Sequence, residues 1–213
     1  MSIVVQKFGG SSVATPEKLN QVAEKIINEV EQKHQVVVVV SAQGKTTDRL
    51  IAEEKEVTSK VYPREHDVLV SVGDQITISK LASLLNDKGY RATSLCGWQI
   101  PIITNSEHMN GRIRYIKNET IIDYLRGSHI VIVAGFQGID EQGNITTLGR
   151  GGSDTTAVAL AASLKAERCD IYTDVDGVFT ADPRVVPEAK KLDIVSYDEM
   201  LELASMGAKV LTT

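Results

Sequence analysis

The sequence predicts an α/β fold, a three-layer α/β/α sandwich with a central, mostly parallel sheet. Apolar runs of strand length alternate along the chain with segments whose apolar residues repeat at helical spacing. Two of these runs, residues 36–40 and 129–134, are rich in β-branched residues and lack polar alternation, which is typical of parallel strands covered on both faces. Right-handed crossover connections are therefore expected between the strands.

The composition is that of a globular protein with a substantial core. The 213 residues are 42% hydrophobic and 24% charged, and no repeat or linker divides them, so we expect one domain over residues 1–213. A net charge of −5 argues against nucleic acid or an anionic membrane as the main partner. Because we find neither a signal peptide nor a run of ~18 apolar residues, we expect a cytoplasmic location. Cys96 and Cys169 lack ligand spacing and are expected to be reduced and buried.

The first forty residues predict a strand, a helix and a second strand. The apolar run at residues 3–8 stops at two glycines, and Thr15 and Pro16 then supply an N-cap and a first-turn proline. Residues 19–30 carry one apolar stripe at helical spacing. The β-branched run at residues 36–40 completes a β-α-β unit.

The loop at residues 41–48 invites comparison with a P-loop. It contains Gly44, Lys45 and Thr46 in the order of that motif, but Val39 stands where the motif requires its first glycine. We therefore interpret it as an ordinary strand-end loop. Such loops at the carboxyl edge of an open α/β sheet commonly bind ligands.

The middle of the chain predicts helices and short strands. Residues 51–62 are charged and helical in pattern, and a second helix opens at residues 73–75, with Asp74 in its first turn. An aspartate there is more often a partner of the helix dipole than a substrate ligand. Trp98 is expected to pack in the core. The remaining elements are one or two strands within 91–104, a hairpin or flap at 105–117, a helix at 118–126, a strand at 129–134, and a turn at 140–144 before residues 145–147.

Residues 148–154, with the sequence LGRGGSD, form the motif around which we build the functional hypothesis. Glycines allow close approach of the backbone to a ligand, and the helix that follows offers unpaired N–H groups and a positive dipole end, with Ser153 or Asp154 as its cap. Arg150 adds a planar cation suited to a carboxylate or a phosphate. The alternative is a glycine loop that only caps a helix.

The C-terminal part predicts two more strands and a helix. Residues 170–179 form a strand that ends in acidic residues, but Asp174 and Asp176 lack the further ligands of a calcium loop. Arg184 lies in a polar loop that contains a proline. Ser196 and Glu199 form a capping box that opens a helix ending at residue 207, and residues 208–211 begin another strand.

Several strand-end loops share residues that suit phosphate. Glycine-rich loops bind anionic oxygens, lysine neutralises a moving phosphoryl group, and aspartates can hold Mg²⁺. No Ser/His/Asp set is evident, and phosphoryl transfer does not need one. The residues alone indicate a nucleotide-dependent phosphotransferase or a nucleotide-binding regulator. The residues concerned are Lys7, Gly9, Gly10, Ser11, Arg150, Gly151, Gly152, Ser153, Asp154, Asp174, Arg184 and Lys209.

Four motifs in order extend this interpretation. Residues 7–13 (KFGGSSV) are similar to a signature quite specific to aspartate kinases, and residues 148–154, 172–184 and 206–211 match further motifs in the same order. Over nearly its whole length the chain thus resembles the amino-acid kinase family, and within it the catalytic domains of aspartate kinases. The resemblance implies a carbamate kinase-like fold and ATP-dependent phosphorylation of the β-carboxylate of L-aspartate to 4-phospho-L-aspartate, the first step towards lysine, diaminopimelate, threonine and methionine.

The resemblance also implies residue roles. Lys7 and Asp154 would be catalytic, Lys7 by offsetting transition-state charge and Asp154 by orienting Lys7 or Mg²⁺. Arg150 would clamp a carboxylate of aspartate. The implied ATP-binding residues are Lys7, Phe8, Gly9, Gly10, Thr173, Asp174, Phe179, Arg184, Lys209 and Val210, and the implied aspartate-binding residues are Thr47, Asp74, Arg150, Gly151, Gly152 and Ser153.

Two departures from the family pattern bear on these roles. Asp74 stands where the family usually has a glutamate, so its contact with the substrate amino group could pass through water. Family members also continue beyond this sequence, through the rest of the kinase domain and a pair of regulatory ACT domains, so we expect a truncated catalytic domain. A homo-oligomer or pairing with a full-length subunit is expected. The alternatives are another amino-acid kinase and a catalytically silent nucleotide-binding fragment or subunit.

Overall fold

The computed structural model describes residues 1–149, 151–173, 177–181, 185–186, 188–196 and 198–200. These residues belong to two compact units, residues 1–172 and residues 173–213, which we describe separately. How far the kinase domain predicted for residues 1–213 extends stays a prediction.

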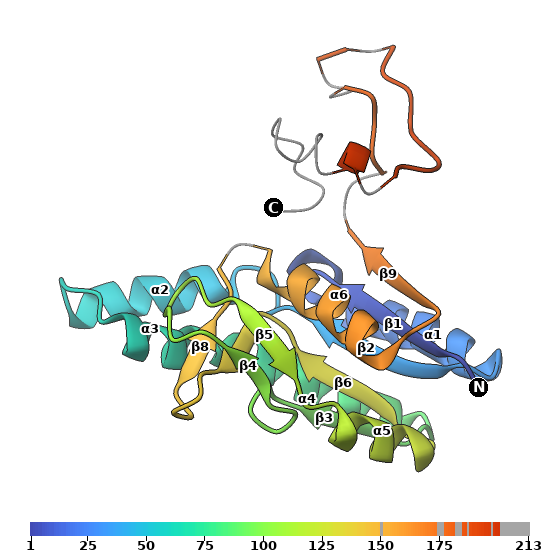
Figure 1. Ribbon diagram of the computed structural model, residues 1–213, viewed down its shortest axis with the longest axis horizontal. Helices are drawn as coiled ribbons and strands as arrows, with labels where there is room; N and C mark the ends of the chain where they lie inside the picture. Colours follow the sequence, from blue (N-terminus) through green and yellow to red (C-terminus); the bar gives the residue numbers. More distant parts are fainter. Residues whose placement is uncertain (150, 174–176, 182–184, 187, 197, 201–213) are drawn as a thin grey trace. The chain divides into compact units, whose positions relative to one another are not determined.

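A five-stranded parallel sheet forms the centre of the first unit (Figure 1). Its order is β3-β6-β2-β1-β9, and every neighbouring pair is parallel. β-Branched residues dominate β2 and β6, as expected for strands buried on both faces. The strands are β1 (Ile3–Phe8), β2 (Gln35–Val40), β3 (Ala92–Leu95), β6 (Ile130–Ala134) and β9 (Arg168–Tyr172).

Helices cover both faces of this sheet, so the predicted three-layer α/β/α architecture is confirmed. Alternate residues of β2 enter two different cores, because side chains in a strand point alternately to opposite faces. Val36 and Val38 pack with helices α1 (Pro16–Glu31) and α4 (Val72–Asp87). Val37 and Val39 pack with α5 (Glu119–Arg126) and α6 (Gly152–Leu164). Figure 1 shows α6 in front of the sheet and α1 behind it.

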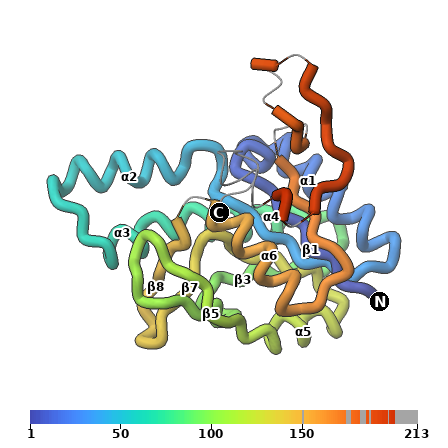
Figure 2. The backbone as a smooth tube through the Cα atoms, turned by 45° about the horizontal axis from the view of Figure 1, so that its top comes forward, coloured from blue at the N-terminus to red at the C-terminus, as the bar shows by residue number. Residues whose placement is uncertain are grey.

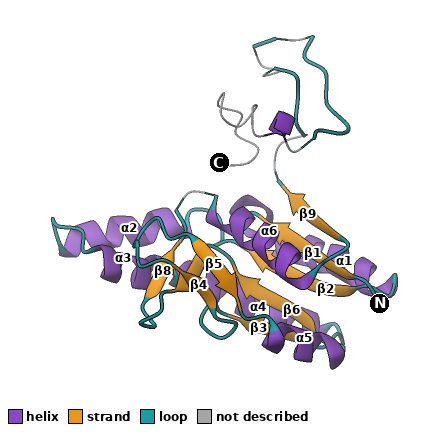
Figure 3. Cartoon of the chain, viewed as in Figure 1, coloured by secondary structure: helices purple, strands orange, loops and turns teal. Residues whose placement is uncertain are grey.

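A second sheet of four short strands was only partly predicted. Its order is β5-β4-β7-β8, with one parallel pair, β4 with β7, and two antiparallel pairs. Figure 3 labels β4, β5 and β8 of this sheet. Strand β5 lies within the hairpin or flap that we expected at residues 105–117, but its partner β4 precedes that range. Strand β7 was missed because it has three residues, one of them glycine. The strands are β4 (Ile102–Thr104), β5 (Ile113–Ile116), β7 (Gln137–Ile139) and β8 (Ile145–Thr147).

Two helices follow β2 and extend to one side of the sheet, on the left of Figure 2. α2 (Thr46–Val57) begins and ends about five residues earlier than the predicted helix at 51–62. α3 (Pro63–Val70) was not predicted, and Ser71 links it directly to α4. The combined segment Pro63–Asp87 is long and apolar enough to pass a composition test for a membrane span. Half of its most apolar window is buried, and Leu81 and Leu85 lie in the protein core, so we assign it to the fold.

Three other residues lie close to where we predicted them. Trp98 packs against the core on the α1 and α4 side, as expected. Both cysteines are free, with Cys96 buried and Cys169 half-buried. Burial raises the pKa of each thiol to about 11.

The second unit contains a short antiparallel pairing. Phe179 forms a bridge with Lys191, flanked by hydrogen bonds from the N–H of Thr180 to the carbonyl of Lys190 and from the N–H of Leu192 to the carbonyl of Val178. The predicted strand at 170–179 is therefore wrong in its extent, since β9 ends at Tyr172. The capping box is confirmed by hydrogen bonds in both directions between Ser196 and Glu199. The strand predicted at 208–211 lies outside the described residues.

Candidate functional site

Three neighbouring parallel strands end in register at one edge of the central sheet. Phe8 at the end of β1 pairs with Val40 at the end of β2, and Val40 pairs with Ala134 at the end of β6. The loops that follow therefore begin side by side. This edge is where open α/β sheets bind ligands, and it contains the predicted Gly9–Gly10 turn.

An ion pair between Lys7 and Asp154 joins β1 to α6. Strand alternation places Lys7 on the same face as Val5, which packs in the core beneath α6. The Nζ atom of Lys7 lies 2.6 Å from Oδ1 of Asp154, and Lys7 is buried. Asp154 stands in the first turn of α6. The two residues predicted to be catalytic are thus in direct contact, which places a buried ammonium at the strand end.

Gly10 marks a point where two loops touch. A Cβ atom at this position would lie 2.5 Å from the carbonyl oxygen of Ala42, closer than real contacts allow. The carbonyl of Gly10 accepts a hydrogen bond from the N–H of Gly44 at 3.0 Å. A Cβ at Gly9 would lie 3.5 Å from the Lys7 ammonium. Glycine is therefore required at position 10 by close packing, and at position 9 it keeps the backbone next to Lys7 uncovered.

Asp74 lies buried beside the loop that follows β2. Only 2% of the residue is exposed, and desolvation raises its pKa well above the usual range, although backbone N–H groups of Ala42 and of Asp74 itself favour the charged form. The neighbouring Gly73 packs against Ala42, and a Cβ there would lie 3.8 Å from the hydroxyl of Thr47. Thr47 and the helix start that carries Asp74, both predicted to bind aspartate, are therefore close together. A buried acid of this kind favours a cationic ligand.

The glycine loop before α6 differs from the prediction in its cap. The N-cap is Gly151, with φ 72° and ψ 7°, and neither Ser153 nor Asp154 caps the helix, because both lie within its first turn. The carbonyl of Gly151 accepts hydrogen bonds from the N–H groups of Asp154 and Thr155. These two groups are thus engaged within the loop, and α6 contributes mainly its positive dipole end to this edge of the sheet.

Close packing holds this first turn against the end of β6. A Cβ at Gly152 would lie 2.9 Å from both Leu148 and Phe136, and a Cβ at Gly135 would lie 2.7 Å from Ser153. Ser153 is buried. The structure therefore brings Gly151, Gly152 and Ser153 to the same edge of the sheet as Lys7, as the predicted site requires.

Phe8, which we predicted to contact ATP, has its side chain in the core. It is 1% exposed and stacks on Tyr172, with ring centroids 4.5 Å apart and the planes at 7°. The ammonium of Lys25 lies 5.1 Å from the centroid of the Tyr172 ring. A contact between Phe8 and a ligand would thus have to involve its backbone.

The other predicted residues are not brought together by the described structure. Thr173 and Phe179 belong to the second unit, so their part in an ATP site stays a prediction. In the described parts of the chain, no cluster of three or more His, Cys, Asp or Glu residues could hold a metal ion. Five predicted site residues lie outside the described residues: Arg150, Asp174, Arg184, Lys209 and Val210.

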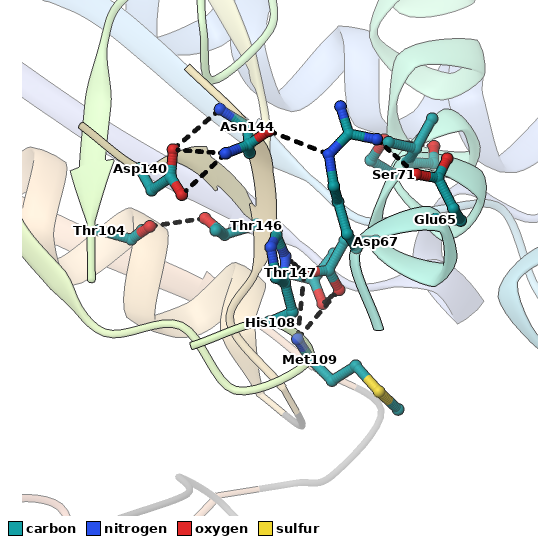
Figure 4. Close-up of polar contacts among 12 residues, drawn as sticks. Glu65, Asp67, Ser71, Thr104, His108, Met109, Asp140, Asn144, Thr146 and Thr147 are labelled. Atoms are coloured by element: carbon teal, nitrogen blue, oxygen red, sulfur yellow. Dashed lines mark hydrogen bonds and ion pairs between the residues drawn. The ribbon is translucent and has the colours of Figure 1, made fainter. Parts of the chain in front are cut away.

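Sequence reasoning missed Asp67 in α3. This carboxylate is fully buried and accepts hydrogen bonds from His108, Met109 and Thr147, three residues distant from it in sequence (Figure 4). The one available signal was its position in a largely apolar segment, seven residues before Asp74. Residues seven apart in a helix lie on the same face.

Comparison with known proteins gives consistent matches. Residues 2–213 match the amino acid kinase family. The chain is 58% identical over 211 residues to an aspartokinase of Bacillus sp. (strain MGA3), covering 99% of this chain and 51% of that protein. The chain spans about half the length of the curated relatives it matches.

Solved structures give the same result. The aspartate kinase from Synechocystis superposes with a TM-score of 0.84 at 48% identity, covering 98% of this chain and 34% of the other. E. coli aspartokinase III in complex with aspartate and ADP superposes with a TM-score of 0.85 at 30% identity, covering 98% and 57%.

Proposed function

The chain belongs to the amino acid kinase family, and we propose that it catalyses, or forms the catalytic core for, the ATP-dependent phosphorylation of L-aspartate on its β-carboxylate. The product is 4-phospho-L-aspartate, an acyl phosphate, made in the cytoplasm at the start of lysine, threonine and methionine biosynthesis. The similarity to aspartokinases over 99% of the chain supports this substrate.

The observation that carries the proposal is the buried Lys7–Asp154 pair beside the Gly9–Gly10 turn. Phosphoryl transfer needs positive charge near the oxygens of the moving group, and little covalent help from the protein. Lys7 supplies this charge from a rigid strand, and Asp154 holds its ammonium in place. Because the pair lies largely out of water, its electrostatic effect is stronger than that of an exposed lysine.

Aspartate would bind between the glycine loop and the buried acid. Arg150 clamps one carboxylate, with Gly151, Gly152 and Ser153 at the positive end of α6. Asp74, with Thr47 beside it, receives the substrate ammonium, which would favour the charged form of this acid. Holding the ammonium and a carboxylate of one small molecule at separate groups orients its β-carboxylate for attack on the γ-phosphorus.

The ATP-binding residues stay those that the family resemblance implies. We assign the phosphates to Lys7, Gly9 and Gly10, and the rest of the nucleotide to Thr173, Asp174, Phe179, Arg184, Lys209 and Val210. Mg²⁺ usually binds through one or two carboxylates and the substrate phosphates, not through a cage made only of protein, so the absence of a metal cluster in the described residues is compatible with it. The ion would neutralise phosphate charge.

The test is aspartate-dependent formation of acyl phosphate, trapped as its hydroxamate, by the purified protein with MgATP. We expect hydroxamate to form with L-aspartate and to be nearly abolished by Arg150→Ala. Arg126→Ala is the matched control, because Arg126 is exposed and pairs with Asp123 one turn earlier in α5. Binding of ATP without hydroxamate would contradict catalysis by this chain and would favour the silent nucleotide-binding subunit.

A further inference from the structure

Asp67 in α3 has a buried carboxylate whose hydrogen-bond partners, among the described residues, lie outside its own helix. Its Oδ1 atom accepts hydrogen bonds from the Thr147 hydroxyl at 2.6 Å and from the Met109 N–H at 3.0 Å. Its Oδ2 atom lies 2.8 Å from Nδ1 of His108 and 3.1 Å from the same Met109 N–H. Since the residue is 0% exposed, these groups replace the water that a carboxylate needs (Figure 4).

These contacts fix the loop between β4 and β5 against the end of β8. The N–H of Gly111 donates to the carbonyl of Thr147 at 2.7 Å. The side-chain hydroxyl of the same Thr147 donates to the Asp67 carboxylate. Met109 has a φ of 65°, a left-handed conformation that costs a residue with a side chain, and its N–H is one of the groups that Asp67 holds. The carboxylate therefore maintains a loop conformation that the chain would not favour alone.

The fixed loop in turn lies on the first glycine of the 149–152 segment. A Cβ at Gly149 would lie 3.1 Å from Oδ1 of Asn110 and 3.4 Å from the carbonyl of Met109, and Gly149 has a φ of 75°. Leu148, the preceding residue, donates from its N–H to the carbonyl of Phe136. Thr147, Leu148 and Gly149 are thus held from two sides just before α6 begins.

Asp67 also belongs to the segment that carries Asp74. Ser71 ends α3 and begins α4, and its N–H donates to the carbonyl of Asp67. The carbonyl of Ser71 accepts a hydrogen bond from the side chain of the buried Gln137 in β7 at 2.9 Å. Asp74 is therefore placed by the same helical segment whose upstream carboxylate, that of Asp67, bonds Thr147 and the loop between β4 and β5.

We propose that Asp67 is a positioning residue that sets the separation between Asp74 and the glycine loop at the start of α6, and hence how well the amino-acid substrate fits between them. The inference rests on the proposed function, in which these two groups bind a carboxylate and the ammonium of aspartate. Asp67 itself touches no substrate. Its contribution is to hold the two binding groups at a fixed spacing, where a displacement of about 1 Å would cost roughly a hundredfold in rate.

Asp67→Asn is the central variant, since it keeps the shape but turns an acceptor into a donor that faces other donors. We expect the KM for L-aspartate to rise about tenfold or more, with the KM for ATP changed less than about threefold. Glu65→Gln on the same helix is the matched control, because Glu65 is exposed and pairs with Arg64. Equal rises in both KM values would overturn the inference.

A second pair of variants guards against simple misfolding. Thr147→Val removes one donor to Asp67 and should raise the KM for aspartate. Thr147→Ser keeps the hydroxyl and should have a KM for aspartate close to that of the unaltered protein. A rise that serine does not reverse would count against the contact.

Hydrogen exchange separates this inference from the proposed function, because it needs no activity. In Asp67→Asn, amides of residues 105–112 and 147–149 should exchange faster, while those of β1 and α1 stay as in the unaltered protein. Unchanged exchange in the loop would refute the positioning role of Asp67. Absence of hydroxamate from the unaltered protein would refute the proposed function alone.

Discussion

Replacing Gly10 by alanine tests whether contact between the loops after β1 and β2 builds the site. The added Cβ would lie 2.5 Å from the carbonyl oxygen of Ala42, whereas ordinary contacts begin at 3.4 Å, so the loops must separate by about 0.9 Å. The hydrogen bond from Gly44 to the Gly10 carbonyl, now 3.0 Å long, lies across the same gap. The carbonyl of Ala42 and the backbone of residue 10 cannot rotate away as a flexible side chain could, so the clash is not relieved locally.

The expected cost has two parts. Overpacking of this kind destabilises a fold by about 1–3 kcal/mol. Displacing the turn that follows Lys7 by nearly 1 Å should reduce turnover by roughly a hundredfold, because phosphoryl transfer depends on position. The loss of activity should therefore exceed what the loss of stability explains at a temperature where the variant stays folded.

Urea unfolding and the hydroxamate assay measure the two parts separately. Gly143→Ala is the control, because Gly143 has a φ of 83° but no atom within 4 Å of the added Cβ. It should lose about 1 kcal/mol through backbone strain alone and keep its turnover. If Gly10→Ala, once folded, turned over at the rate of the unaltered protein, close packing of the two loops could not be what positions the site.

Three further predictions follow from burial. Because burial raises the pKa of Asp74, the ligand-free protein should lose stability as pH rises through that raised pKa. Asp74→Asn should remove this loss and should match the stability of the unaltered protein at acid pH. Thermal melts across pH would contradict this if the stability of the two proteins changed with pH in parallel. The thiols of Cys96 and Cys169, with pKa raised to about 11, should react with a disulfide reagent at pH 8 roughly a hundredfold more slowly than free cysteine, and rapid labelling of the folded protein would disprove their burial. Leu81→Ala should cost about 2–5 kcal/mol in urea unfolding, because Leu81 is fully buried, whereas Val57→Ala at an 89% exposed position should cost under about 0.5 kcal/mol; equal losses would be inconsistent with this core.

The local patterns of the sequence were sufficient to predict the helices and strands whose apolar residues repeat at regular spacing. The β1-α1-β2 unit followed from an apolar stripe at helical spacing and a valine run, since each pattern has one structure that buries it well. The parallel sheet followed from the same reasoning. The glycine-rich motifs also located the edge of the sheet where the candidate site lies, because only a few residue types permit a backbone to come so close to a neighbour.

Short or irregular elements were decided by contacts distant in sequence. Strand β7 is three residues long and exists because β4 and β8 pair with it on either side. Local preference predicted Ser153 or Asp154 as the N-cap of α6, but the N-cap is Gly151. Ser153 instead packs against Gly135, and Asp154 pairs with Lys7.

The sequence by itself determined the α/β class, the alternation of the main strands and helices along the chain, and the motifs that suit phosphate and carboxylate. Only the tertiary structure decided that Lys7 contacts Asp154 and that Asp67 joins α3 to β8 and to the loop between β4 and β5. The physical reason is that periodicity reports which face of an element is buried, whereas the partner of a buried charge depends on which segments the completed fold brings together.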